Sequence, residues 1–316
     1  MTLPRRALGS GGREVGAVGL GCMGMSYAYG AAERDDEQSR AVLHRALDLG
    51  VTLIDTADVY GPFTNEELVG SALAGRRDEA FLATKCGLLL GPDGIVRDGR
   101  PEHVRVALDA SLRRFGTDRV DLWQLHRVDP AVPVEETWGA MAEQVAAGKA
   151  LALGMSEVGV EELTRAAAVH PVATVQSELS LWTRDPLPEV LPWCAENGAG
   201  FLAFSPLGRG FLTGTLAPGS FDDGDFRARN PRFTPEAMAA NTALVEQVRA
   251  VAGRVGATPA QVSLAWVLAQ GEHVVPIPGT KKLRYLEENA ASATVTLTAD
   301  DLAELDALPA PVGARY

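Results

Sequence analysis

Four side chains that can hold or transfer protons stand near the ends of short apolar runs. Asp55 ends the run LID, Lys85 directly follows FLAT, and His126 directly follows VDLWQL. Tyr60 comes five residues after Asp55, in a turn next to a glycine and a proline. The apolar runs are roughly 30 to 40 residues apart, about one strand–helix unit. If these runs are neighbouring strands of a barrel, the reactive groups converge on one mouth.

Together these groups predict acid–base chemistry on a carbonyl. A phenol titrates near pH 10 in water, and a nearby ammonium favours the phenolate, so Lys85 makes the Tyr60 proton easier to give up. Asp55 would hold Lys85 in place as its ion-pair partner. A neutral His126 could donate a hydrogen bond to a carbonyl oxygen. We therefore predict Asp55, Tyr60, Lys85 and His126 as the catalytic residues, although none of them is a nucleophile.

Taken singly, these residues also have ordinary structural explanations. An aspartate at a strand end often caps a helix or forms a turn. His126 could be a hydrogen-bonded core histidine, and Tyr60 a surface aromatic. The lysine is different, because an amine drawn into an apolar site needs a partner such as Asp55. The catalytic interpretation depends on the joint placement.

Eight short apolar runs alternate with amphipathic segments, which predicts a (β/α)8 TIM barrel of the α/β class. The candidate strands are 17–21, 52–55, 80–84, 120–125, 150–155, 174–177, 200–204 and 274–277. Ser156 follows the fifth strand. With no shift in composition along the chain, we expect a single domain over residues 1–316. The competing architecture is an open doubly wound sheet.

Helix signals support this alternation. Apolar residues recur on one helical face in 104–115 and 134–145. Gly50 and Gly116 end such segments, and Thr258 with Gln261 predicts a capping box. The segment 205–235 is rich in Gly, Pro and Asp and is too long for an ordinary connection, so we expect a lid or a partly mobile loop.

Composition and charge exclude several classes of function. A net charge of −12 would repel phosphate backbones and anionic lipid, so nucleic acid and membrane are poor partners. No apolar run approaches the length of a transmembrane helix, and residues 1–9 lack the apolar region of a secretory signal. Three cysteines without CxxC spacing favour a reduced, cytoplasmic protein without a metal.

The chain resembles the aldo-keto reductases over essentially its whole length. The resemblance rests on several separated motifs, which are GLGCMGMS (19–26), LIDTADVYG (53–61), ATKCG (83–87), DLWQLHRVDP (121–130), GMSEV (154–158), VQSELSLW (175–182), FSPLGRGFLTG (204–214) and PIPGTKKLRYLEEN (276–289). It implies a barrel enzyme in which hydride from NADPH attacks an aldehyde or ketone. Tyr60 would then protonate the alkoxide.

The resemblance also implies a cofactor site. Ser156 and Gln176 would bind the nicotinamide carboxamide, and Phe204 would stack on the nicotinamide ring. Other residues would cover the pyrophosphate, hold the adenosine end or line the site, and the full implied set is Gly21, Cys22, Met23, Asp55, Ser156, Gln176, Phe204, Ser205, Pro206, Leu207, Gly208, Arg209, Gly210, Phe211, Ile277, Gly279, Thr280, Lys281, Glu288 and Asn289.

Two features bear on how the cofactor is held. Many members of the family have Asn after the serine and Tyr at the stacking position, whereas this chain has Glu157 and Phe204. Gly279 and Thr280 are expected to open a helix. A helix N-terminus with Lys281 beside it would form an anion site, and this favours NADPH over NADH.

The residues leave two other functions open, and two other motifs in the chain lack their usual context. Lys85 with a pKa lowered by burial could form a Schiff base in a lyase or aldolase, or the chain could be a weakly catalytic nicotinamide-binding regulatory subunit. The GxGxxG at 19–24 lacks a βαβ context, and Val158 replaces the second glycine of a nucleophile elbow. Tyr27, Tyr29 and the segments 88–97 and 221–233 are expected to line or cover the pocket. The substrate and the oligomeric state stay open.

Overall fold

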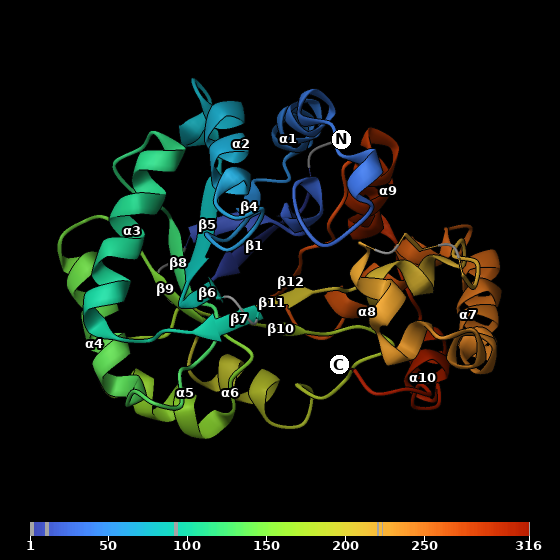
Figure 1. Ribbon diagram of the computed structural model, residues 1–316. Helices are drawn as coiled ribbons and strands as arrows, with labels where there is room; N and C mark the ends of the chain where they lie inside the picture. The colour runs from blue at the N-terminus through green and yellow to red at the C-terminus, as the bar shows by residue number, and fades with distance from the viewer. Residues whose placement is uncertain (1–2, 10–12, 92–93, 220, 223, 316) are drawn as a thin grey trace.

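Eight parallel strands form a closed ring with helices around it (Figure 1). The structure is a computed structural model that describes residues 3–9, 13–91, 94–219, 221–222 and 224–315. In sheet order the strands are β12 (Val274–Pro276), β11 (Gly200–Phe204), β10 (Thr174–Glu178), β9 (Leu153–Ser156), β8 (Leu122–Leu125), β5 (Phe81–Cys86), β4 (Leu53–Asp55) and β3 (Leu20–Gly21). These are the eight predicted runs, and the largest differences are that 17–21 shortens to β3 and that 150–155 becomes Leu153–Ser156.

Backbone hydrogen bonds close the ring between its first and last strands. The amide of Gly19 donates to the carbonyl of Pro276 at 2.9 Å, and the amide of Gly21 donates to Pro278 at 3.3 Å. Gly21 and Gly279 form a further parallel bridge. A side chain on Gly21 would place its Cβ 3.0 Å from the Ile277 carbonyl oxygen, so glycine allows this close approach. The predicted (β/α)8 barrel is confirmed.

The interior of the barrel changes from apolar to reactive along each strand. Side chains alternate between the two faces of a strand, so every second residue points inward. In β4 the inward residues are Leu53 and then Asp55, and in β5 they are Phe81, Ala83 and then Lys85. The apolar cluster at the start of the strands therefore supports polar groups at their carboxyl ends.

A hairpin that the sequence did not predict packs at the apolar end of the barrel. It consists of β1 (Arg5–Leu8) and β2 (Arg13–Gly16). Leu8 and Val15 join the interior cluster with Leu53 and Leu202. The mouth at the other end of the strands is thereby left as the open end.

Helices cover the outside of the barrel and are α1 (Asp36–Leu49), α2 (Thr64–Leu73), α3 (Pro101–Phe115), α4 (Val134–Ala146), α5 (Val160–Ala167), α6 (Val190–Glu196), α7 (Pro235–Val255), α8 (Pro259–Leu268), α9 (Leu283–Ala291) and α10 (Ala299–Asp306). Gly50 and Gly116 end α1 and α3 with φ of +84° and +66°. The predicted capping box of Thr258 and Gln261 is present at the start of α8. No helix in the described part of the chain is long and apolar enough to cross a bilayer.

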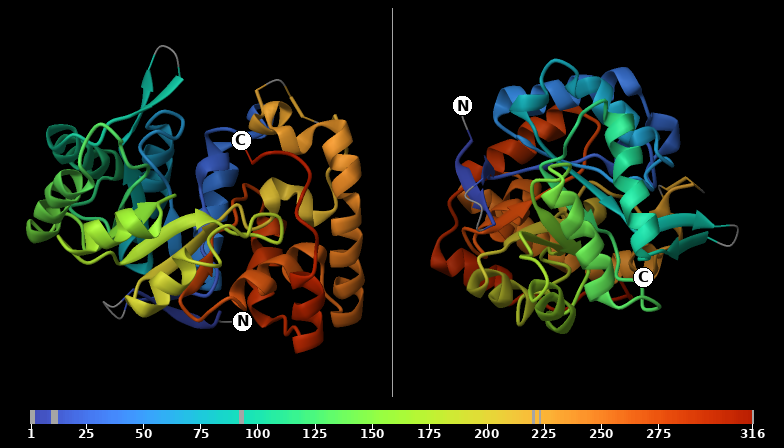
Figure 2. Two further views of the ribbon diagram at one scale, coloured as in Figure 1. Left: turned by 90° about the horizontal axis from the view of Figure 1, so that it is seen from below. Right: turned by 90° about the vertical axis from the view of Figure 1, so that its left-hand side faces the viewer.

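Two irregular connections differ from expectation. The segment 205–235 is not a structureless loop, because it contains the 3₁₀-helices Gly208–Thr213, Phe226–Arg229 and Pro231–Phe233. The segment 88–97 forms a hairpin of β6 (Leu88–Gly91) and β7 (Gly94–Arg97), which projects from the barrel (Figure 2). Residues 92–93, 220 and 223 of the predicted pocket segments lie outside the described residues.

Candidate active site

A buried ion pair lies at the carboxyl ends of β4 and β5. The ammonium of Lys85 donates to Asp55 Oδ1 at 2.5 Å and to the carbonyl of Thr56 at 2.8 Å. The Lys85 side chain is 1% exposed and that of Asp55 is 5% exposed. A buried ammonium requires a close anion and further acceptors, and this geometry supplies both. The predicted partnership of the two residues is present.

Two buried amides complete the interior charge network, by which we mean Asp55, Lys85, Gln124 and Gln176. Asp55 Oδ2 accepts hydrogen bonds from Gln124 Nε2 at 3.1 Å and from Gln176 Nε2 at 2.8 Å. Gln124 was not predicted. Its signal was a polar residue inside the apolar run VDLWQL, at an inward position two residues before His126. The network holds the carboxylate by charge on one oxygen and by amide donors on the other.

Tyr60 and His126 lie beside this network. The Lys85 ammonium is 5.3 Å from the centroid of the Tyr60 ring. The ring of His126 meets that of Tyr60 edge-on, with 5.8 Å between the ring centroids, and the ring of Tyr27 stacks on Tyr60 with 6.2 Å between centroids. The structure therefore brings the four predicted catalytic residues together and places Tyr27 with them.

Electrostatics set the protonation states of the two central groups. Burial raises the pKa of Tyr60, and the opposing effects of Lys85 and Arg127 do not cancel it. Burial acts to lower the pKa of Lys85, but Asp55 and Tyr60 outweigh it, so the lysine pKa is raised. The expected effect of Lys85 on the phenol is thus real but smaller than desolvation. At neutral pH Tyr60 is a neutral phenol and Lys85 an ammonium.

His126 is held as a neutral imidazole. Burial, reinforced by the cations Lys85 and Arg127, lowers its pKa well below the ordinary value. Its Nδ1 is buried and has no hydrogen-bond partner among the described residues. A neutral ring carries one N–H that can be donated to a ligand. This agrees with the state assumed for His126 from the sequence.

Asp58, three residues after Asp55, is a second buried carboxyl group, and its pKa is raised. Burial, together with the charge of Glu66, raises the pKa of Asp58 to about 8. Glu66 itself pairs with Arg114 at 2.6 Å and accepts from Thr84 at 2.5 Å. Asp58 Oδ1, in contrast, has no hydrogen-bond partner in the described part of the chain.

The end of β9 joins the site to an arginine that sequence reasoning did not assign. Ser156 is 1% exposed, and its hydroxyl accepts from Arg127 Nη1 at 3.0 Å. The same nitrogen donates to the carbonyl of His126 at 2.5 Å. Arg127 follows the predicted catalytic residue His126 in the quoted motif DLWQLHRVDP, and this position was the available signal.

Glu157 is engaged by the C-terminal residues. Its φ is +56°, a left-handed conformation that asparagine adopts more readily than glutamate. Glu157 Oε1 accepts from the amide of Glu178 at 2.9 Å and pairs with Arg315 at 2.7 Å. The Arg315 guanidinium also lies 5.8 Å from the centroid of the Phe204 ring. The charge that replaces the usual asparagine is therefore compensated by a residue 158 positions away.

The segment 312–315 is tied to its surroundings along its backbone. Asn241 makes two hydrogen bonds to the backbone of Val312, at 2.8 and 3.0 Å. Asn230 and Arg209 donate to the carbonyl of Arg315 at 2.9 and 3.1 Å. The arginine of the predicted pyrophosphate loop is thus linked to the C-terminal segment.

The remaining residues of the expected cofactor site fall into two groups. Most of them lie at or just beyond the strand ends, namely Gly21, Met23, Gln176, Phe204, Ser205, Leu207, Gly208, Arg209, Gly210, Gly279, Thr280 and Lys281. Others have side chains turned into the core or already bonded. Cys22, Phe211 and Ile277 belong to apolar clusters, Pro206 and Asn289 are buried, and Glu288 accepts from Thr258 at 2.6 Å.

The predicted start of the last cofactor helix is wrong. Helix α9 begins at Leu283, and Gly279 instead pairs with Gly21 across the barrel seam. Lys281 is half-buried, and its ammonium donates to the carbonyl of Gly30 at 2.8 Å. Closure of the barrel therefore holds 277–279 in an extended form. Gly279 and Thr280 do not begin a helix, so the anion site expected at that helix N-terminus is not formed by these residues.

Comparison with known proteins decides the family. The sequence matches the profile of the Aldo/keto reductase family over residues 17–310. The chain belongs to the aldo/keto reductase family. This aldo/keto reductase is thus an oxidoreductase of that family.

Solved structures agree with this assignment. The chain is similar to the glycerol dehydrogenase AKR11B4 from Gluconobacter oxydans, with a TM-score of 0.85 and 30% identity over 96% of this chain and 94% of that one. It is similar to the thermostable aldo-keto reductase Tm1743, solved with the inhibitor epalrestat, with a TM-score of 0.78 and 30% identity over 96% and 99%. It is also similar to the holo form of the aldo-keto reductase AKR11C1 from Bacillus halodurans, with a TM-score of 0.80 and 26% identity over 96% of this chain and 95% of that one.

Aldo/keto reductases generally use NAD(P)H, and the residues at this mouth fit such a dinucleotide. The half-buried ring of Phe204 ends β11 at the open end of the barrel. Ser205, Gly208, Arg209 and Gly210 all have positive φ, from +48° to +95°. The amides of Gly208 and Gly210 donate to the carbonyls of Ser205 and Leu207, at 2.9 and 3.0 Å, so the loop holds its own backbone in tight turns at the open end. Lys281, which follows this loop in the sequence, adds a half-buried positive charge next to the barrel seam.

Proposed function

We propose that this aldo/keto reductase reduces aldehydes or ketones to alcohols with NADPH, with Tyr60 as the general acid. The observation that carries the proposal is the position of a neutral phenol beside a buried ammonium at the open end of the barrel. Lys85 Nζ lies 5.3 Å from the centroid of the Tyr60 ring and 2.5 Å from Asp55 Oδ1. Tyr60 therefore keeps its proton until a stronger base appears next to it.

The reaction requires one hydride and one proton. NADPH, when bound, supplies the hydride to the carbonyl carbon. The π electrons of the carbonyl move to oxygen, and Tyr60 gives its phenolic proton to the alkoxide. The Lys85 ammonium stabilises the phenolate that remains, and a proton from solvent restores the phenol.

His126 acts on the substrate carbonyl, and Asp55 acts on Lys85. The neutral imidazole of His126 donates a hydrogen bond to the substrate carbonyl oxygen, which orients and polarises it. Asp55 holds Lys85 in position and keeps it charged. Gln124 and Gln176 restrain the other carboxylate oxygen at 3.1 and 2.8 Å.

The cofactor assignments extend the same proposal. Ser156 and Gln176 would hold the carboxamide, Phe204 would stack on the nicotinamide ring, and the backbone of 205–211 would cover the pyrophosphate. Lys281 would face the phosphate of the adenosine end, which supports NADPH rather than NADH. Each of these groups lies at the open end of the barrel or in the loops beyond it.

The protonation state of Lys85 disfavours the lyase alternative. A Schiff base requires a neutral amine, whose pKa is lowered by its site. Here the pKa of Lys85 is raised, because Asp55 and Tyr60 outweigh the effect of burial. Borohydride trapping of a carbonyl compound on Lys85 would support that alternative.

The direct test is Tyr60→Phe, assayed with a panel of aldehydes and ketones by NADPH absorbance, with NADH in parallel. We expect turnover to fall by about 100- to 10,000-fold, the range for a lost general acid, while NADPH binding measured by protein fluorescence is retained. Tyr285→Phe, which makes the same chemical change on the surface of α9, is the matched control. Unchanged turnover in Tyr60→Phe would contradict the proposal, and tight NADPH binding without turnover in the wild type would favour a regulatory subunit.

A further inference from the structure

Beside the catalytic mouth lies a cavity of about 530 Å³ that the catalytic residues do not line. Its wall includes Arg127 and Glu157, which directly follow His126 and Ser156. The cavity therefore adjoins the position where a carbonyl would meet Tyr60. Valines 128, 132, 134 and 158 supply an apolar part of the wall.

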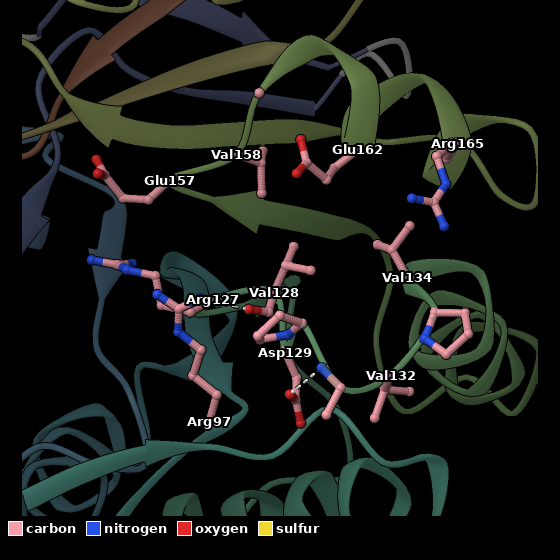
Figure 3. A pocket seen from close by; sticks show the side chains of 14 residues that line it. Arg97, Arg127, Val128, Asp129, Val132, Val134, Glu157, Val158, Glu162 and Arg165 are labelled. Atoms are coloured by element: carbon pink, nitrogen blue, oxygen red, sulfur yellow. Dashed lines mark hydrogen bonds between the residues drawn. The ribbon is translucent and has the colours of Figure 1, made fainter.

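Two arginines with no carboxylate partner among the described residues lie at one end of this cavity. Arg97 comes from the end of β7, and Arg127 follows β8. Figure 3 shows both side chains extending toward the same end, on the side where Glu157 lies. Two unpaired guanidinium groups repel each other, so an anion between them would remove an unfavourable interaction.

Each guanidinium is positioned by backbone carbonyls and keeps donors to spare. Arg127 uses Nη1 for the His126 carbonyl and the Ser156 hydroxyl, at 2.5 and 3.0 Å. Its Nε and Nη2 make no hydrogen bond to another described residue. Arg97 uses Nη1 for the Val128 carbonyl at 3.1 Å. The free edges of a guanidinium match the two oxygens of a carboxylate or phosphate.

The other charged groups of the wall are occupied or distant. Glu157 pairs with Arg315 at 2.7 Å, and Arg165 pairs with Glu135 at 2.7 Å. Asp129 accepts from two backbone amides, at 2.9 and 3.0 Å. In Figure 3, Glu162 lies toward the end where Arg165 is found, away from the two arginines.

We propose that Arg127 and Arg97 bind an anionic oxygen group of the substrate, so that the enzyme prefers small carbonyl compounds bearing a carboxylate or phosphate. The inference rests on the proposed carbonyl reduction and specifies its substrate class. Arg127 also exerts a positive electrostatic influence on Tyr60 and His126. Its Nη1 also donates to the backbone carbonyl of His126 at 2.5 Å, so an anion bound by this side chain lies next to the mouth.

The test uses three matched aldehydes with NADPH: 4-carboxybenzaldehyde, 4-formylphenyl phosphate and the neutral methyl 4-formylbenzoate. In Arg127→Met we expect kcat/KM for the preferred anionic aldehyde, relative to the neutral ester, to fall by about tenfold or more. Arg97→Met should lower the same ratio less, by about three- to tenfold, because this side chain is exposed. Arg127→Lys should restore part of it, because it keeps the charge but loses the planar donor pair. The two anionic aldehydes distinguish carboxylate from phosphate.

Arg165→Met is the matched control, because Arg165 lines the same cavity but is paired with Glu135, and it should leave the ratio unchanged. The same ratio in wild type and Arg127→Met would overturn the inference while leaving the proposed function intact. An equal loss for all three aldehydes with weaker NADPH binding would also overturn it, by assigning Arg127 to the cofactor. No NADPH oxidation with any aldehyde would contradict the proposed function itself.

Discussion

The interior charge network and the arginine pair, Arg97 and Arg127, differ in how their charges are compensated. The charges of the network are buried and paired, whereas the two arginines have no carboxylate partner among the described residues. In the network, Lys85 and Asp55 are almost fully buried, and the carboxylate is bonded through both oxygens. At the pair, Arg97 and Arg127 border an open cavity, and their described contacts are to neutral oxygens. Burial makes an unpaired charge costly, so the network is complete without a ligand. Cations at a cavity lie in contact with water, and their unused donors remain for a ligand.

Removing one member of the interior charge network should have the largest effect on stability and turnover. In Lys85→Met, Asp55 stays buried with only amide donors, so we expect stability to fall by about 3 kcal/mol in urea unfolding. Turnover should fall at least about 1000-fold, because the ammonium that stabilises the Tyr60 phenolate is lost. A variant that is unstable but as active as wild type would contradict the role of Lys85.

Asp58 extends the comparison, because it is a buried carboxyl group that forms no ion pair with a described residue. Its pKa is raised to about 8 by burial, so the folded protein keeps a proton that the unfolded chain loses near pH 4. Between about pH 4 and 8 the unfolded chain binds fewer protons, so this group lowers stability as pH rises.

Asp58→Asn removes that titration. We expect the variant to match wild type near pH 4 and to become more stable than wild type as pH rises, by about 5 kcal/mol at pH 8, measured by urea unfolding across this range. A difference that does not grow with pH would show that Asp58 is ionised in the folded protein.

Arg315 differs from Arg97 and Arg127, because it is an arginine at the mouth that is paired with a carboxylate, Glu157. Besides Glu157, it pairs with Glu178 at 2.8 Å. Glu178 also pairs with Arg209 at 3.0 Å, so it keeps one cation when Arg315 is removed and the loss is partial. We expect Arg315→Met to cost about 1 kcal/mol of stability and to weaken NADPH binding about threefold, because Glu157 and Phe204 lose a contact. Arg105→Met, which breaks an exposed pair with Glu143, should change neither quantity. Unaltered NADPH affinity in Arg315→Met would separate this segment from the cofactor site.

Local patterns predicted the parts of the molecule that local physics determines. The eight strands follow from apolar runs, and the position of Lys85 beside Asp55 follows from inward positions on adjacent strands. The capping box of Thr258 follows from three residues. The assignment of 1–316 to one domain stays a prediction, as do the roles of the site residues.

The remainder depended on contacts that sequence spacing does not reveal. Glu157 and Arg315 are 158 residues apart, and nothing near either residue indicates the other. The start of α9 was misplaced because pairing of Gly279 with Gly21 prevails over the local tendency to begin a helix. Arg127 and Gln124 were visible within a quoted motif, but only their neighbours' geometry shows what they contact.

The central claim, that Tyr60 rather than His126 supplies the proton, is tested most directly by pH dependence in both directions. The raised pKa of Tyr60 keeps the acid protonated, so carbonyl reduction in single turnover should be level from about pH 6 to 9. Alcohol oxidation with NADP⁺ needs the phenolate and should rise about tenfold per pH unit over the same range. A reduction rate that instead falls as pH rises through 6 to 7, with Tyr60→Phe behaving in the same way, would assign the acid to His126 and contradict the mechanism.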